Sequence, residues 1–173
     1  MNYFESLKKS MSNISNIKNS IFIGQSVIYS GNLIYKTLNH IPKSKKIELP
    51  VFEDVQMGMS IGLALEGFLP VTCYPRFDFL LLGFNQMINH LDKIPLMTEY
   101  RYKPKVIIRV MVGAKKPLDG GEQHTQDYSL YLKEHLKTIN VYQLFNSNDV
   151  MKCYNKAIKS DQSSLMVEYA EKI

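Results

Sequence analysis

Short β-rich runs alternate with helical segments along almost the entire chain, and this alternation restricts the fold more than any other feature. Six runs are expected to be strands: residues 20–24, 46–49, 69–74, 105–111, 139–144 and 165–169. Helical periodicity or capping signals fill the intervals, at residues 3–14, 32–39, 54–66, 77–93, 126–135 and 148–159. Such alternation predicts a single α/β domain spanning residues 1–173, with a parallel β-sheet flanked by helices on both faces.

The second run leads into an unusual helix. A lone glutamate, Glu53, stands where the helix begins, after an apolar stretch. Glycines at 58 and 62 lie four residues apart inside the helix, and each costs roughly 1 kcal/mol relative to alanine. We therefore expect another backbone to pack closely against this side of the helix. An acid in the first turn also simply favours the helix dipole, so Glu53 taken alone has a structural explanation.

Two segments follow strands and therefore belong to the edge of the sheet where ligands bind. Ligands of open parallel sheets lie beyond the carboxyl ends of the strands. Glu53 follows the second run, and residues 112–123 follow the fourth. This second segment has no periodicity and contains three glycines and a proline, so we predict a loop.

Several motifs together resemble the pyrimidine-binding domain of thiamine diphosphate enzymes, in particular the beta subunit of 2-oxoacid dehydrogenase E1 components. Residues 49–67 resemble P-I-x-E-x-G-F-x-G-x-A-x-G-A-A-x-x-G. Residues 69–79, continued by 84–89, resemble R-P-I-x-E-x-x-x-x-[DN]-F and x-x-D-Q-[IV]-x-N. Residues 120–126 resemble G-x-x-x-Q-H-S-Q. The resemblance implies a transketolase-like pyrimidine-binding domain without the C-terminal domain of those beta subunits.

The resemblance also implies site residues. The family's glutamate, here Glu53, hydrogen-bonds N1′ of the aminopyrimidine and favours its imino tautomer. Phe79 corresponds to the aromatic residue that packs on the pyrimidine, and Val51, which precedes Glu53, is expected to contribute to the cofactor site. His124 corresponds to the histidine that faces the thiazolium and exchanges protons with the bound intermediate. Glu53 and His124 are thus the expected catalytic residues.

These assignments have structural alternatives and departures from the family pattern. Phe79 could be a core aromatic at a strand-to-helix junction, and a lone histidine is more often structural than catalytic. Asn85 replaces the usual aspartate, and Met111 replaces a proline. Residues 115–117, Lys-Lys-Pro, occupy a loop that the family keeps small, where basic side chains could attract an anionic substrate or simply be solvated.

The metal half of a thiamine diphosphate site is missing from the sequence. The family binds Mg²⁺ and the diphosphate through a Gly-Asp-Gly motif, which does not occur here, and no glycine-rich phosphate loop is present. We therefore expect no metal ligands in this chain. A partner, an E1-alpha-like subunit in an α2β2 assembly, would hold Mg²⁺ and the diphosphate.

The implied function is a beta-like subunit of a two-component enzyme that decarboxylates a 2-oxoacid and transfers the resulting acyl or aldehyde unit. Two alternatives remain open. One is an oxidative E1 component that passes the acyl group to a lipoyl domain. The other is a non-catalytic scaffold subunit of the same fold.

Composition argues against other classes of protein. The net charge of +5 could indicate a nucleic-acid-binding protein. Acidic residues are spread throughout the chain, however, and no aromatic residue lies within the cluster Lys43, Lys45 and Lys46 to stack on bases, so this class is disfavoured. No stretch approaches the roughly 20 apolar residues of a membrane span, and the N-terminus does not resemble a signal peptide. Cys73 and Cys153 have no metal-site spacing and are expected to be buried thiols. We expect a cytoplasmic protein.

Overall fold

A six-stranded, entirely parallel sheet forms the centre of the computed structural model, which describes residues 1–116 and 119–173. The strands are β1 (Ser20–Gly24), β2 (Lys46–Glu48), β3 (Leu69–Tyr74), β4 (Ile107–Val112), β5 (Ile139–Gln143) and β6 (Ser163–Tyr169). Their order is β2-β1-β3-β4-β6-β5, and every neighbouring pair is parallel. The predicted fold class is therefore confirmed.

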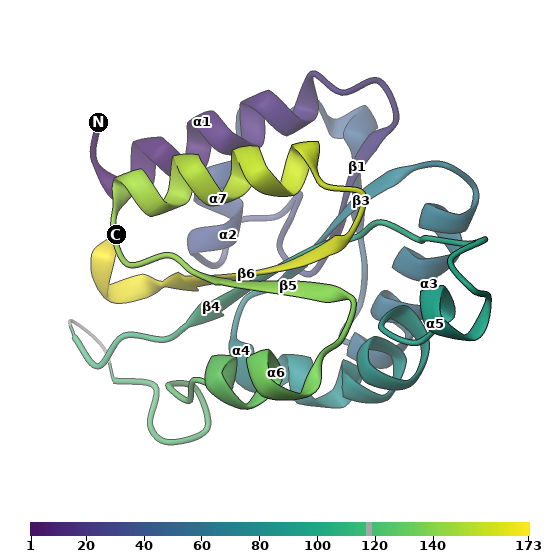
Figure 1. Ribbon diagram of the computed structural model, residues 1–173. Helices are drawn as coiled ribbons and strands as arrows, with labels where there is room; N and C mark the ends of the chain where they lie inside the picture. The colour runs from purple at the N-terminus through teal and green to yellow at the C-terminus, as the bar shows by residue number, and fades with distance from the viewer. Residues whose placement is uncertain (117–118) are drawn as a thin grey trace.

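Helices cover both faces of this sheet (Figure 1). The α-helices are α1 (Tyr3–Ser15), α2 (Leu33–Leu38), α3 (Glu53–Leu65), α4 (Phe77–Leu80), α5 (Ile94–Met97), α6 (Ser129–His135) and α7 (Ser147–Lys159). Helices α1, α2 and α7 lie on one face, where residues such as Met11 and Phe22 form one core cluster. Helices α3, α4 and α6 lie on the other, where residues such as Met57 and Phe77 form the second. No helix among the described residues is long and apolar enough to cross a membrane.

The long helix predicted over residues 77–93 is wrong. Helix α4 passes into a 3₁₀ turn, η2 (Leu81–Gly83), and then into a π-helix, η3 (Asn85–Leu91). A Cβ atom on Gly83 would lie 3.2 Å from the carbonyl oxygen of Glu53. The glycine therefore allows this segment to pack against the start of α3, and the change of helical pitch accompanies that contact.

Close backbone packing against the glycines of α3 was also a wrong expectation for the described part of the chain. A Cβ atom on Gly62 would meet nothing within 4 Å, and one on Gly58 would only touch the Gln86 side chain at 3.8 Å. Gly62 is exposed. The small residues of α3 thus leave part of the helix bare without an intramolecular partner.

The remaining boundaries agree with the sequence patterns to within a few residues. The loop predicted over residues 112–123 begins in the structure at Gly113, because Val112 is the last residue of β4. Residues 117 and 118 of this loop lie outside the described residues. Cys73 is buried and Cys153 is half-buried, and both are free thiols. Burial raises the pKa of the Cys73 thiol to about 11, so this sulfur is a packing group.

Candidate functional site

The carboxyl ends of β1, β2, β3 and β4 gather the side chains that the sequence analysis singled out. Glu53 is the first residue of α3, which follows β2. Its residue is only 4% exposed, whereas its neighbours Val51 and Phe52 are 70% and 60% exposed. These apolar neighbours are therefore not what buries Glu53. The carboxylate instead lies against the end of the sheet, while Val51 faces solvent.

Two groups hold Glu53 in place. Gln25, directly after β1, donates from Nε2 to Glu53 Oε1 at 3.0 Å. The hydroxyl of Tyr74, the last residue of β3, donates to the Glu53 carbonyl oxygen at 3.2 Å. Among the described residues no group donates to Glu53 Oε2. One carboxylate oxygen is thus fixed, and the other is free to bind a ligand.

A second acid positions the loop that carries Gln25. Glu48 ends β2, and its carboxylate accepts hydrogen bonds from the backbone N–H groups of Ser26, Val27 and Ile28, at 2.5, 2.9 and 2.7 Å. Ser26 has a φ of 56°. Because hydrogen bonds to a charged group are the strong ones, Glu48 can hold this left-handed turn in place. Sequence reasoning missed both Gln25 and Glu48, although their positions at strand ends were a usable signal.

Phe79 and His124 form the other part of the site. Their rings meet edge to face, with centroids 5.6 Å apart and planes at 82°. A Cβ atom on Gly113, directly after β4, would collide with the His124 carbonyl oxygen. The glycine therefore lets the histidine segment pack against the end of β4. The structure thus brings these two predicted residues together, but no contact joins either of them to Glu53.

One imidazole nitrogen of His124 is committed to a hydrogen bond, and the other has no partner among residues 1–116 and 119–173. Nδ1 lies 2.8 Å from the carbonyl oxygen of Gly120. A carbonyl only accepts hydrogen bonds, so Nδ1 must carry the hydrogen. Nε2 is consequently left to accept or donate a proton in the adjoining space.

Two depressions lie on either side of His124. The aromatic hollow, of about 350 Å³, is lined by Asp78, Phe79, Leu81, Gln123, His124 and Gln126. The basic groove has two parts, of about 390 and 490 Å³, which share Leu33, Lys36 and Arg76. His124 lines the aromatic hollow and the first part of the basic groove.

Asp78 provides an independent sign that the aromatic hollow accepts a polar group. Both carboxylate oxygens of Asp78 are buried and have no hydrogen-bond partner among the described residues. Unsatisfied buried oxygens are costly, so they favour a ligand that donates hydrogen bonds. The Phe79 ring and the Asp78 acceptors thus fit an aromatic group that carries N–H donors, whereas Glu53 is not among the residues that line this hollow.

The other histidines do not line these depressions. The His135 ring stacks on the Tyr131 ring with centroids 4.1 Å apart, and its Nδ1 contacts the Tyr131 carbonyl oxygen. His40 contacts Ser12, and His90 contacts Gln86. None of these contacts involves a predicted site residue, which agrees with structural roles.

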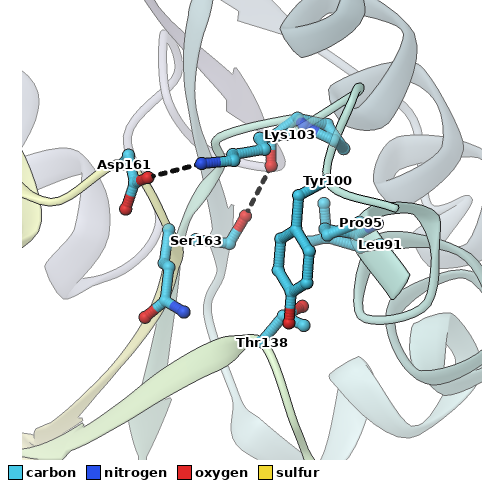
Figure 2. A pocket seen from close by; sticks show the side chains of 9 residues that line it. Leu91, Pro95, Tyr100, Lys103, Thr138, Asp161 and Ser163 are labelled. Atoms are coloured by element: carbon cyan, nitrogen blue, oxygen red, sulfur yellow. Dashed lines mark hydrogen bonds and ion pairs between the residues drawn. The ribbon is translucent and has the colours of Figure 1, made fainter. Parts of the chain in front are cut away.

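A further small cavity, of about 60 Å³, lies at the opposite edge of the sheet, where β4, β5 and β6 begin. Figure 2 shows its lining residues, including Tyr100 and the exposed ion pair between Lys103 and Asp161. None of the predicted site residues lies there. In the described residues no cluster of three or more histidine, cysteine or acidic side chains could hold a metal ion.

Comparison with known proteins identifies similar sequences. The chain is 25% identical over 173 residues to the pyruvate dehydrogenase E1 component subunit beta of Gracilaria tenuistipitata var. liui, covering 96% of this chain and 52% of that protein. It is 26% identical over 125 residues to a chloroplastic pyruvate dehydrogenase E1 component subunit beta-4 of Oryza sativa subsp. japonica, covering 71% of this chain and 30% of that one. The chain thus spans about half or less of the length of these relatives. No family model matches.

Two solved structures with the same fold are transketolases. A split-gene transketolase, described as an inactive beta4 tetramer, superimposes with a TM-score of 0.69 at 16% identity, covering 95% of this chain and 50% of that chain. The transketolase of Campylobacter jejuni subsp. jejuni gives 0.71 at 14% identity, covering 96% of this chain and 25% of that one. The predicted resemblance to E1 beta subunits and to the transketolase-like fold is therefore confirmed.

Proposed function

We propose that this chain is the beta-like, pyrimidine-binding subunit of a two-component thiamine diphosphate enzyme that decarboxylates a 2-oxoacid and transfers the resulting acyl or aldehyde unit. The similarity to pyruvate dehydrogenase E1 beta subunits along 96% of the chain supports this class of function. The site supports it through one observation above all: Glu53 is buried at the start of α3 with a carboxylate oxygen free to bind a ligand.

Glu53 would hold a proton at N1′ of the aminopyrimidine. When bound, thiamine diphosphate supplies the electron sink that decarboxylation of a 2-oxoacid requires. A carboxyl group hydrogen-bonded to N1′ keeps that ring in the protonation state that the chemistry needs. A glutamate that served only the helix dipole would not require burial, because the dipole effect operates at exposed helix ends. The 4% exposure of Glu53 therefore favours the functional role.

Phe79 and His124 would serve the same cofactor from the aromatic hollow. The Phe79 ring would pack against the pyrimidine, and the orphan oxygens of Asp78 would accept hydrogen bonds from a donor of the bound group. His124 Nε2 would give and take a proton at the substrate oxygen, with Nδ1 held by the Gly120 carbonyl oxygen. Val51 is exposed and could contact the cofactor only in company with another subunit.

A partner subunit is part of this proposal. The exposed side of α3 and of the neighbouring η2 carries large apolar residues: Val51, Phe52, Val55, Met59 and Leu82. Exposed apolar patches mark interaction sites in soluble proteins. Because the patch adjoins Glu53, an E1-alpha-like subunit that covers it could bring the diphosphate and Mg²⁺ to this site. An α2β2 assembly and a cytoplasmic location remain predictions from the resemblance and the composition.

Reconstitution with an E1-alpha-like subunit tests the proposal. The complex, loaded with thiamine diphosphate and Mg²⁺, should release CO₂ from at least one member of a panel of 2-oxoacids. Glu53→Gln should assemble normally but lower turnover by about 10²-fold or more, because glutamine cannot hold the proton. Glu66→Gln, at the exposed far end of the same helix, is the matched control and should retain full turnover.

The result also separates the alternatives. A complex that binds the cofactor but releases no CO₂ from any acid would identify a scaffold. If turnover required a lipoyl acceptor, the enzyme would be an oxidative E1 component. Equal turnover in Glu53→Gln and the wild type would refute the role of Glu53.

A further inference from the structure

The basic groove beside His124 is lined by three cationic side chains and by no aspartate or glutamate side chain among the described residues. Lys36 and Arg76 line both of its parts, and Lys116 lines the part that includes His124. The groove side chains therefore carry a net positive charge. This imbalance favours an anionic ligand.

Arg76 is the residue best placed to bind such a ligand. It follows β3 at the carboxyl edge of the sheet, and one guanidinium nitrogen, Nη1, donates to the Pro75 carbonyl oxygen at 2.7 Å. Within the described part of the chain no carboxylate lies at ion-pair distance from Arg76. Its remaining N–H donors are thus free, and a planar guanidinium matches a carboxylate or phosphate group in bidentate geometry.

Lys36 extends the groove away from the proposed reaction centre. It lies on α2, and the second part of the groove adds Ser30, Gly31, Asn32 and Tyr35, without His124. A ligand whose reacting end lies near His124 therefore has room to extend toward Lys36. With volumes of about 390 and 490 Å³, the two parts can hold a reactive end and an anchoring end of one ligand.

Assuming the proposed function, we propose that the basic groove binds the distal anionic group of the substrate. The substrate class is then a 2-oxoacid with a second carboxylate or a phosphate, held by Arg76 and Lys36. The groove could instead bind the carboxylate at C1 of the substrate, but that group is lost as CO₂ during decarboxylation. Strong binding of that group would stabilise the ground state and not the transition state. A distal anion persists throughout the reaction, so its binding energy positions the substrate at every step.

Titration of the isotope-labelled chain, residues 1–173, without cofactor or partner, tests this assignment. Three probes are compared by amide chemical shifts: 2-oxoglutarate, 2-oxopentanoate, which replaces the distal carboxylate by a methyl group, and inorganic phosphate. We expect 2-oxoglutarate to bind at least about tenfold more tightly than 2-oxopentanoate. The reason is that a hydrogen bond to a charged group contributes a free energy equivalent to a tenfold or larger change in affinity. The shifted amides should include Leu33, Lys36 and Gly113.

Variants identify the residues responsible. Arg76→Ala and Lys36→Ala should each remove most of the preference for 2-oxoglutarate, and Arg76→Lys should restore part of it by keeping the charge. Lys152→Ala, which removes an exposed lysine of α7 remote from the groove, should leave the preference unchanged. Preserved amide spectra establish that each variant is folded.

Three outcomes would overturn the proposal. The first is equal affinity for 2-oxoglutarate and 2-oxopentanoate. The second is a preference for 2-oxoglutarate that survives both Arg76→Ala and Lys36→Ala. The third is binding of phosphate as tight as that of 2-oxoglutarate, which would indicate a general anion site. Absence of shifts at concentrations on the order of 10 mM also counts against it. Failure here would leave decarboxylation by the reconstituted complex intact, so the two proposals are tested separately.

Discussion

Removing Glu168 should destabilise the protein more than any surface change, because Glu168 compensates a fully buried arginine in the centre of the sheet. Arg109 on β4 donates from Nε and Nη2 to the two carboxylate oxygens of Glu168 on β6, each at 2.8 Å. Both side chains are completely buried. The hydroxyl of Tyr154 on α7 donates to the same carboxylate at 2.5 Å, and Thr37 on α2 accepts from Arg109 at 3.2 Å.

The magnitude follows from what each substitution leaves unpaired. Glu168→Leu strands the buried charge of Arg109, which costs about 3–5 kcal/mol. It also leaves the buried Tyr154 hydroxyl without an acceptor, which adds about 1–3 kcal/mol. In the double variant Arg109→Met, Glu168→Leu, only the Tyr154 contribution remains. Arg109→Met alone strands the buried Glu168 carboxylate at a similar cost of about 3–5 kcal/mol. The two single variants together should therefore lose more stability than the double variant, by a coupling free energy of at least about 3 kcal/mol.

Urea unfolding followed by circular dichroism measures these differences through the transition midpoint, with the slope as a check on two-state behaviour. Lys103→Ala breaks the exposed Lys103–Asp161 ion pair of Figure 2 and serves as a control that should scarcely move the midpoint. If the double variant were destabilised by the sum of the two single variants, charge compensation would not be the reason for the pair.

Three further predictions concern the site and the fold. His124→Ala in the reconstituted complex should slow product formation by about 10²–10⁴-fold while exchange of the cofactor C2 proton stays near the wild-type rate; equal losses in both would assign His124 a structural role. The isolated chain should bind thiamine diphosphate weakly or not at all in the presence of Mg²⁺, and micromolar binding by calorimetry would contradict the divided site. Asp92 is buried, which by itself would raise its pKa, but hydrogen bonds from Lys93 and from the backbone N–H groups of Thr138 and Lys137 outweigh burial and lower the pKa. Since a lowered pKa stabilises the fold above the unfolded-state value, Asp92→Asn should destabilise the protein at neutral pH, and this difference should shrink as the pH falls below about 4.

The sequence was sufficient for the order of the elements, and it named candidate site residues whose roles stay predictions. Alternation of apolar runs with helical periodicity follows from local geometry, so a parallel sheet with two covered faces could be predicted from it. Glu53, Phe79 and His124 were identified from short motifs. The structure places all three at the carboxyl edge of the sheet and pairs the last two. Val51, in contrast, is exposed.

Only the tertiary structure decided which distant residues meet. Gln25 reaches Glu53 across 28 positions, and Arg109 pairs with Glu168 across 59, because strands that are neighbours in the sheet are separated along the chain. The break after α4 likewise depends on how closely Gly83 approaches the start of α3, which no local pattern encodes. The chain's own residues therefore specify the elements and the chemistry available, whereas packing determines which of those groups stand together and which oxygens remain free.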